Sequence, residues 1–262
     1  MSHTKTKTRK HGLARVLSKL GVCSRTRAAE MIRAGRVRVD GSVERDPERP
    51  TLAHAVRIEV DGAPIEGSRR VYLALNKPRG LIVSASDERG RHTIYELFTD
   101  AELPWIAPVG RLDKASEGLL LLSNDPEWAA GITDPASHIA KTYHAQVQGL
   151  PTDAVLEAMK AGIDDRGEHL AAASAKVLRS GEKNAWLEIV LDEGRNRHIR
   201  RLLTALDHPV LRLVRIAIGP IQLGTLAKGA WRHLSEDEIA ACRSEFKAPL
   251  LIPFLRAEKA IE

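Results

Sequence analysis

The most suggestive carboxylate in this chain is Asp113. It follows Gly110–Leu112 and precedes the very apolar run Gly118–Leu122, a pattern that predicts a loop beside a buried strand. A carboxylate in such a place is partly desolvated and needs a cationic partner to stay ionised. Arginine suits that role because its charge is permanent and its planar fork can hold both carboxylate oxygens. Taken alone, Asp113 fits either a structural ion pair or a catalytic group.

Other kinds of chemistry find little support in the residue spacing. The histidines do not fall at metal-ligand spacing with cysteines or carboxylates, so we expect no metal site. The phosphate-binding pattern GxxxxGK[ST] is absent, which argues against ATP-driven chemistry and a nucleotide cofactor. Cys23 and Cys242 lie far apart and form no metal or disulfide framework. Two reduced thiols in a cytoplasmic protein are the expected interpretation.

The composition indicates a globular protein of one large or two modest domains. The chain has 262 residues, of which 43% are hydrophobic. No run approaches the roughly 18 apolar residues of a membrane span. The N-terminal segment is basic, but no apolar stretch follows it, so we do not expect a secretory signal.

Positive charge is concentrated in the first quarter of the chain. Residues 1–70 hold sixteen Lys/Arg and eight Asp/Glu, a net charge of +8, against +6 for the whole chain. Residues 71–262 therefore carry a net charge of −2. Such asymmetry suggests a nucleic-acid-binding module on a near-neutral body. A basic but merely solvated surface would give the same numbers, so both interpretations stay open here.

The N-terminal quarter has the pattern of a small folded module. Residues 1–10 are expected to be a flexible basic tail, and residues 11–62 an independent unit. Apolar spacing predicts a helix over 13–20 and a second over 25–34, the latter capped by Ser24. The alternation around Asp40-Gly41 predicts a β-hairpin, and residues 56–62 repeat the strand-and-turn pattern.

A linker over 63–70 and a larger domain over 71–245 should follow. Strand-like runs outnumber helical patterns, which occur at 152–161 and 197–206. We therefore expect an α+β fold on a mixed, mostly antiparallel sheet flanked by helices. Residues 246–262 are predicted to be a C-terminal extension, in the form of an appended helix. The strand-like runs are VYLALNK, GLLLLSND, TYHAQVQG, AWLEIVLDEG and RLVRIAIGPI.

The stretch LARVLSKLGVCSRTRAAEMIRAGRVRVDG, at 13–41, resembles an S4 RNA-binding domain. Its helix caps, its strand and turn and its arginines agree with that family. The basic side chains are closely spaced and suited to holding phosphates around a small apolar core. A helix-turn-helix-like unit with a solvated basic face is the alternative. The RNA-binding candidates are Lys19, Arg25, Arg27, Arg33 and Arg36.

Four ordered blocks carry a second resemblance. VGRLDKASEGLLLLSND (109–125) resembles the catalytic stretch of pseudouridine synthases. LNKPRG (75–80), KTYHAQVQG (141–149) and the segment 193–223 are similar to the neighbouring blocks of that family's ribosomal small-subunit and large-subunit branch. With the S4-like module, the likeness covers roughly residues 12–240. It implies an enzyme that isomerises a specific uridine of ribosomal RNA to pseudouridine.

The resemblance also implies roles for particular side chains. Asp113 matches the nucleophile, and Arg200 matches its cationic partner. Tyr143 matches the active-site tyrosine, which stacks on the flipped-out base and helps to move its proton. Arg111 either fills the space that the base leaves or contacts a phosphate. The carboxylate attacks either C1′ of the sugar or the uracil ring, and both routes stay open.

The resemblance implies further that the enzyme needs no cofactor and acts as a monomer in the cytoplasm. Ser116 stands where threonine is frequent, and Arg197-His198 stands where His-Gln is frequent. The first change keeps the hydroxyl, and the second leaves Arg200 in register. Two alternatives are a non-catalytic RNA-binding or ribosome-assembly factor and a nucleotide-dependent RNA enzyme with a borrowed S4 module.

Overall fold

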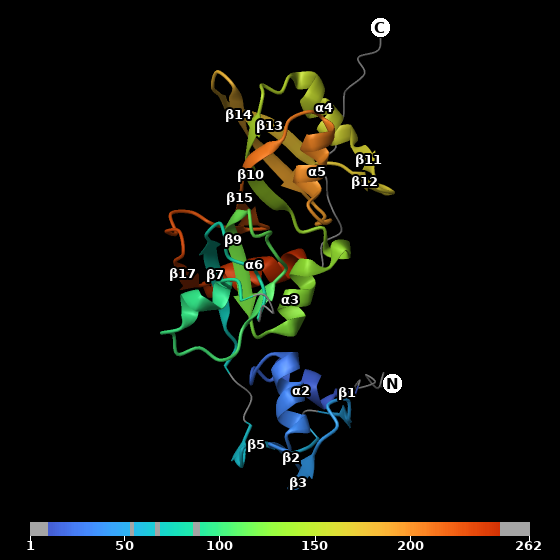
Figure 1. The fold of residues 1–262 in the computed structure, drawn as a ribbon, viewed down its shortest axis with the longest axis vertical. Helices are drawn as coiled ribbons and strands as arrows, with labels where there is room; N and C mark the ends of the chain where they lie inside the picture. The colour runs from blue at the N-terminus through green and yellow to red at the C-terminus, as the bar shows by residue number, and fades with distance from the viewer. Residues whose placement is uncertain (1–9, 53–54, 66–68, 86–89, 247–262) are drawn as a thin grey trace, which may run out of the picture. The chain divides into compact units, whose positions relative to one another are not determined.

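The computed structural model describes residues 10–52, 55–65, 69–85 and 90–246, which form two compact units (Figure 1). Unit 1 contains the chain up to Ala130 together with Leu223–Leu234. Unit 2 contains Gly131–Gln222 and the chain from Ser235 onward. The predicted basic tail and C-terminal extension lie almost entirely outside the described residues. Among the helices described, none is long and apolar enough to cross a membrane.

Unit 1 begins with a small module of two helices and short strands. The predicted helices are present as α1 (Leu13–Lys19) and α2 (Arg25–Arg33). The hydroxyl of Ser24 caps α2 by accepting a hydrogen bond from the backbone N–H of Arg27 at 3.1 Å. Leu13, Leu17, Ala28, Ile32 and Val37 are fully buried and form the centre of the module's core. The strands are β1 (His11–Gly12), β2 (Val37–Val39), β3 (Ser42–Glu44), β4 (Pro50–Thr51), β5 (Ile58–Val60) and β6 (Ala63–Pro64).

Two Asp-Gly turns set the register of the module's four-stranded sheet, whose order is β3-β2-β5-β6. Asp40 and Gly41 have φ angles of 51° and 81°, and Asp61 and Gly62 have φ angles of 52° and 82°. Two successive positive φ angles are the requirement of the tight hairpin turn that matches strand twist. The hairpin predicted at Asp40-Gly41 is therefore present, and the same turn chemistry joins β5 to β6.

The rest of unit 1 is built around β9 (Glu117–Ser123), all seven residues of which are buried. β9 pairs antiparallel with β7 (Tyr72–Lys77) and with β8 (Ala107–Val109), and β7 pairs with β17 (Trp231–His233). The short helix η1 (Ile94–Phe98) precedes β8, and α3 (Pro126–Thr133) begins directly after β9. β17 comes from Leu223–Leu234, the returning segment, in which the chain comes back to unit 1 after most of unit 2.

Unit 2 contains a sheet of order β13-β14-β10-β15, whose neighbouring strands are all antiparallel. Alternate strand residues are buried in one core with Met159 of α4 and Ile199, Leu202 and Leu203 of α5. The two helices therefore cover one face of the sheet (Figure 1). The elements are η2 (Pro135–Ser137), β10 (Lys141–Gln148), α4 (Asp153–Ala161), β11 (Ile163–Asp165), β12 (Glu168–Leu170), β13 (Ser174–Ser180), β14 (Asn184–Leu191), α5 (His198–Ala205), β15 (Val210–Ile218), β16 (Ile221–Gln222) and α6 (Glu236–Glu245).

The predicted fold class, α+β with a mostly antiparallel sheet and flanking helices, is confirmed. All five predicted strand runs are strands, as β7, β9, β10, β14 and β15, and both helical patterns are helices, as α4 and α5. The predicted domain boundaries at 62, 70 and 245 remain a proposal. The structure adds α3, α6, β8, β13 and β17, which the apolar patterns do not indicate.

Candidate active site

Asp113 lies in the tight loop between β8 and β9. The backbone carbonyl of Asp113 accepts a hydrogen bond from the N–H of Ser116 at 3.0 Å, which closes a turn immediately before β9. The side chain of Leu112 is 8% exposed and anchors the loop in the core, whereas the neighbouring Arg111 is exposed. Asp113 itself is half-buried. The predicted loop beside a buried strand is therefore present, and Asp113 is partly shielded from solvent in it.

A buried lysine is hydrogen-bonded to the backbone of this loop. Lys77, the last residue of β7, is 0% exposed. Its ammonium group donates to three backbone carbonyl oxygens, those of Pro78 (3.0 Å), Asp113 (3.3 Å) and Ser116 (2.9 Å). Burying a charge is unfavourable unless it is hydrogen-bonded, and these carbonyls meet that need. Lys77 therefore couples the end of β7 to both ends of the turn that carries Asp113.

The charge of Lys77 is also electrostatically coupled to the loop. Burial lowers the pKa of Lys77 to about 8, while the nearby charges of Glu117 and Asp113 act in the opposite direction. Glu117 is buried at the start of β9, and its carboxylate accepts from the ammonium group of Lys228 at 2.6 Å. Lys228 belongs to the returning segment of unit 1. Two lysines, Lys77 and Lys228, and two acidic residues, Asp113 and Glu117, thus lie near the N-terminal end of β9.

In unit 2, Tyr143 lies on β10. It is half-buried and packs against the core cluster under α5. It lies opposite Ile189 of β14 and Arg215 of β15, and the pairing with β15 shifts register between Thr142 and Tyr143. Such an irregularity locally turns the strand and redirects its side chains. The tyrosine is therefore seated in the sheet at a point where the ladder is not regular.

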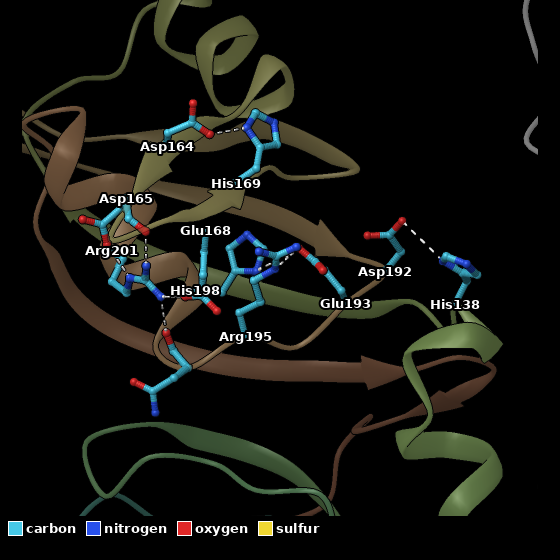
Figure 2. Close-up of polar contacts among 11 residues, drawn as sticks. His138, Asp164, Asp165, Glu168, His169, Asp192, Glu193, Arg195, His198 and Arg201 are labelled. Carbon is cyan, nitrogen blue, oxygen red and sulfur yellow. Dashed lines mark hydrogen bonds and ion pairs between the residues drawn. The ribbon is translucent and has the colours of Figure 1, made fainter.

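Arg200 lies on α5, directly before Arg201, whose side chain contacts the β11–β12 hairpin. One terminal nitrogen of Arg200 donates to the carbonyl oxygen of Val210 at 3.3 Å. Arg201 donates to the carboxylate of Asp165 at 2.5 Å and to its backbone oxygen at 2.7 Å, and it also contacts the carboxylate of Glu168 (Figure 2). The β11–β12 hairpin is thereby attached to α5. This attachment limits how far the helix that bears Arg200 can move within unit 2.

The start of α5 is fixed by a second set of contacts. Arg197 precedes the helix with a φ of 49°, and His198, the first helical residue, is 3% exposed. Burial lowers the pKa of His198, although its Nδ1 lies 3.9 Å from a carboxylate oxygen of Glu193. Glu193 also pairs with Arg195 at 2.8 Å, as Figure 2 shows. Arg197-His198 thus forms an ordered helix start, in which burial of the His198 imidazole favours its neutral form.

The predicted RNA-binding residues of the N-terminal module lie on its surface. Arg25 pairs with Glu48 at 3.1 Å and Arg27 with Glu30 at 3.0 Å. Exposed pairs of this kind contribute at most about 1 kcal/mol, so a phosphate group can readily replace the carboxylate. Arg36 forms two hydrogen bonds with Asp61, and Lys19 lies 3.1 Å from a ring nitrogen of His11. Arg33 is exposed at the end of α2, and within the described ranges its side chain has no carboxylate partner.

Two further histidines each lie close to one carboxylate. His138 lies 3.9 Å from Asp192, and His169 lies 2.9 Å from Asp164 (Figure 2). In the part of the chain that the structure describes, no group of three or more His, Cys, Asp or Glu side chains could hold a metal ion.

Sequence reasoning missed Lys77. It belongs to the block LNKPRG, but nothing in that spacing shows that the ammonium group is buried against a loop thirty-six residues away. Asp113 belongs to unit 1, whereas Tyr143 and Arg200 belong to unit 2, and each is positioned by contacts within its own unit.

Most of the chain is similar in sequence to known proteins. Residues 71–205 match the model of the RNA pseudouridylate synthase family, and residues 12–51 match that of the S4 domain. A ribosomal large subunit pseudouridine synthase B from Bacillus subtilis (strain 168) is 36% identical over 234 residues, which cover 88% of this chain and 95% of that protein. An uncharacterized RNA pseudouridine synthase from Aquifex aeolicus (strain VF5) is 41% identical over 225 residues, which cover 86% of this chain and 90% of that protein.

A solved structure agrees with these sequences. A crystal structure of a pseudouridylate synthase superposes with a TM-score of 0.62 at 28% identity, covering 88% of this chain and 99% of that one. The matched family region contains the Asp113 loop, Tyr143 and Arg200. The chain therefore belongs to the RNA pseudouridylate synthase family, with an S4 domain at its N-terminal end.

Proposed function

We propose that this RNA pseudouridine synthase converts a specific uridine of ribosomal RNA to pseudouridine, with Asp113 as its catalytic carboxylate. The assignment of Asp113 rests on the hydrogen bonds by which Lys77 holds the Asp113 loop. Lys77 is fully buried and donates to the Asp113 and Ser116 carbonyls. A catalytic group must be held close to one geometry, and a loop tied to a buried strand supplies that rigidity.

The reaction requires one bond exchange on the target nucleotide. The uridine leaves its stack and enters the site, at a cost that RNA contacts elsewhere must offset. Asp113 assists cleavage of the N1–C1′ bond as a nucleophile. The uracil then rotates, a C5–C1′ bond forms, the bond between Asp113 and the nucleotide is broken, the proton on C5 is lost and N1 gains a proton. Atoms and electrons balance, because the product is an isomer of the substrate.

Tyr143 and Arg200 are assigned the remaining catalytic roles. The ring of Tyr143 stacks on the detached uracil, and its hydroxyl helps to move the C5 proton. Arg200 is assigned the role of the cationic group that keeps Asp113 ionised, as the family resemblance implies. The anchoring of the neighbouring Arg201 to the β11–β12 hairpin supports this role, because it fixes α5 within unit 2. Arg111, exposed beside Asp113, either occupies the space left by the base or contacts a phosphate.

Ribosomal RNA is proposed as the substrate on two grounds. The similar Bacillus subtilis protein is named for the large ribosomal subunit, and the blocks at 75–80, 109–125, 141–149 and 193–223 match the ribosomal branch of the family. The S4 domain would hold a structured RNA through phosphates while the catalytic domain takes one exposed base. A cytoplasmic location and a monomeric state accompany this proposal, and size-exclusion chromatography with light scattering checks the latter.

The test is to map pseudouridine in ribosomal RNA. Purified enzyme is incubated with small-subunit and large-subunit ribosomal transcripts and with transfer RNA, and carbodiimide-dependent primer-extension stops are recorded. Wild type should produce a stop at one uridine, whereas Asp113→Asn should produce none while binding the RNA normally. Asp100→Asn, an exposed aspartate of unit 1, is the matched control and should act like wild type. A stop made equally well by Asp113→Asn would reject the assignment of the carboxylate, and stops only in transfer RNA would reject the substrate.

A further inference from the structure

The sheet of unit 2 carries a tryptophan between two arginines on the face opposite α4 and α5. Cross-strand pairing places Arg179 of β13 opposite Trp186 of β14. Trp186 lies opposite Gln146 of β10, which in turn lies opposite Arg212 of β15. Because side chains alternate between the two faces of a strand, these four residues form one row across four strands. Their neighbours in sequence, such as Leu187 and Leu213, are buried in the core on the other face.

Both arginines contact the tryptophan ring. The guanidinium carbons of Arg179 and Arg212 lie 5.1 Å and 5.9 Å from the centre of the Trp186 ring. These distances are within the range of cation–π attraction, which is weak at exposed sites. Both arginines are exposed, while the tryptophan is half-buried. The row therefore presents an aromatic ring at the surface, with a positive charge close to it on either side.

The surface is hollowed at this ring. A pocket of about 270 Å³ is lined by His144, Leu178, Arg179, Trp186, Arg212 and Val214. It is slightly smaller than the roughly 300–1,000 Å³ of pockets that enclose drug-sized ligands, which favours one flat ring over a large cofactor. Leu178 lies at a shift in the β13–β14 register and is 41% exposed, so it adds an apolar wall. The hollow thus combines an aromatic floor, an apolar side and cationic edges.

The adjacent row carries a matched pair of charges. Glu188 of β14 is hydrogen-bonded to Lys176 at 2.8 Å and lies 3.3 Å from a ring nitrogen of His144. The hydrogen bond from Lys176, with that from His144, holds the pKa of Glu188 below its usual range. The carboxylate is therefore ionised and already matched by Lys176. Arg179 and Arg212 are two further cationic side chains on this face, at the edge of the hollow.

We propose that this face is a second RNA-binding site, in which an unpaired base stacks on Trp186 and Arg179 and Arg212 bind the flanking phosphates. Aromatic rings within cationic grooves bind single-stranded RNA in this way, since every base has a π-face. When a base stacks on the Trp186 ring, it displaces a guanidinium group from that ring. The displaced guanidinium group then pairs with a phosphate. The inference deepens the proposed function, because it adds a contact with the same substrate outside the catalytic residues.

The experiment measures RNA affinity directly. Fluorescence anisotropy follows binding of a fluorescein-labelled oligouridylate and of a ribosomal RNA transcript to full-length protein. Trp186→Ala should weaken binding of the oligouridylate about 5- to 100-fold, the range that loss of one stacked base produces. Trp186→Phe retains a ring and should stay within about threefold of wild type. Leu150→Ala, an exposed apolar residue of the same unit at 48% exposure, is the matched control and should bind normally.

The arginines are tested by the salt dependence of binding. Arg179→Gln and Arg212→Gln should each lower the slope of log affinity against log salt by about one, because each removes one phosphate contact. Thermal unfolding of every variant establishes that it is folded. For a Trp186→Ala protein that does not fold, photocrosslinking of 4-thiouridine RNA to wild type replaces the affinity measurement. The crosslink should map to the β14 segment Asn184–Leu187.

The outcomes separate this inference from the proposed function. Affinity unchanged in a folded Trp186→Ala protein, or crosslinks that map elsewhere, would overturn the second site. Unchanged RNA affinity with lost affinity for a glutamate-rich peptide would also overturn it and assign the face to an acidic protein segment. If instead Trp186→Ala weakens RNA binding while wild type modifies no ribosomal uridine, the second site stands and the proposed substrate fails.

Discussion

The ammonium group of Lys77 and the carbonyl oxygen of Ser116 lie 2.9 Å apart inside unit 1, at the point where β9 begins. A charged group fully buried beneath a loop is uncommon, because desolvation of a lysine is costly without hydrogen-bonding partners. Here three backbone carbonyls provide those partners. Lys77 thus holds the loop of Asp113 from its interior side, through the backbone carbonyl oxygens of Asp113 and Ser116.

Replacing Lys77 by methionine should loosen this loop. The three carbonyl oxygens would lose their donor, so the free energy of unfolding should fall by about 1–3 kcal/mol. The turnover number should fall as well, because Asp113 would sample more positions. Urea unfolding and single-turnover kinetics at saturating RNA measure the two effects. Lys183→Met, at an exposed turn of unit 2, is the control and should change neither. Full turnover by Lys77→Met would contradict the proposal that Lys77 positions the Asp113 loop.

Stability should depend on pH through the same lysine. The pKa of Lys77 is lowered from 10.5 to about 8 in the folded protein. Between these values the unfolded chain binds more protons at this position, so the free energy of unfolding rises with pH. Below about pH 8 the cost of burying the charge is fully present. Urea titrations of wild type and Lys77→Met from about pH 7 to pH 10.5 should therefore diverge in favour of wild type as the pH rises. Parallel curves would show that the lysine titrates normally.

The S4 domain should contribute salt-dependent affinity. Arg33 is exposed at the end of α2, and among the described residues it has no carboxylate to release. Arg33→Gln should reduce the salt slope of RNA binding by about one and leave turnover at saturating RNA unchanged. Arg166→Gln, on the β11–β12 turn with 82% side-chain exposure, should leave the slope as in wild type. Filter binding over a range of potassium chloride measures both.

A complete removal of residues 1–62 extends this prediction. Affinity for RNA should fall in a strongly salt-dependent way, because residues 1–70 carry a net charge of +8. The chemical step should survive at saturating RNA. A truncated enzyme without activity would mean that the S4 domain also shapes the catalytic site.

Arg201 should be required for the order of α5. Arg201→Met removes the contacts to Asp165 and Glu168 and leaves two carboxylates close together on β11 and β12. Thermal unfolding should occur at a lower temperature than in wild type, and turnover should fall because Arg200 directly precedes Arg201 on the helix. Arg201→Lys keeps the positive charge but loses the planar guanidinium group, which can bind two acceptors at once. Its melting temperature should therefore lie between those of Arg201→Met and wild type. A wild-type melting temperature in Arg201→Met would show that the hairpin does not need this arginine.

Local signals made much of this fold predictable. Ser24 is a good cap and Asp40-Gly41 a strong turn signal, and both act through backbone groups within three residues. The apolar run of β9 predicts its burial directly. The helix α6 was missed, although Ser235 and Glu238 form a capping box that the sequence displays. In β13, most residues are exposed, so no alternation marks the strand.

The unpredicted parts of the site depend on distant residues. Lys77 acts on a loop thirty-six residues later. The row that joins Arg179, Trp186 and Arg212 depends on register across four strands, with an irregularity in two of the three pairings. A one-residue change of register would send Trp186 to the opposite face, so its partners cannot be found from spacing alone. The family resemblance supplied Asp113, Tyr143 and Arg200, but not the contacts that position them.

The return of Leu223–Leu234 to unit 1 has a consequence for biosynthesis. The partner of β7 at Trp231–His233 and the partner of Glu117 at Lys228 emerge from the translating ribosome long after Ser123. At about 5–20 residues per second, this delay is roughly 5 to 20 seconds. During that time the Asp113 loop is made but its surroundings are incomplete. A nascent chain of this enzyme would therefore complete the surroundings of the Asp113 loop only after Lys228 and Trp231–His233 have emerged.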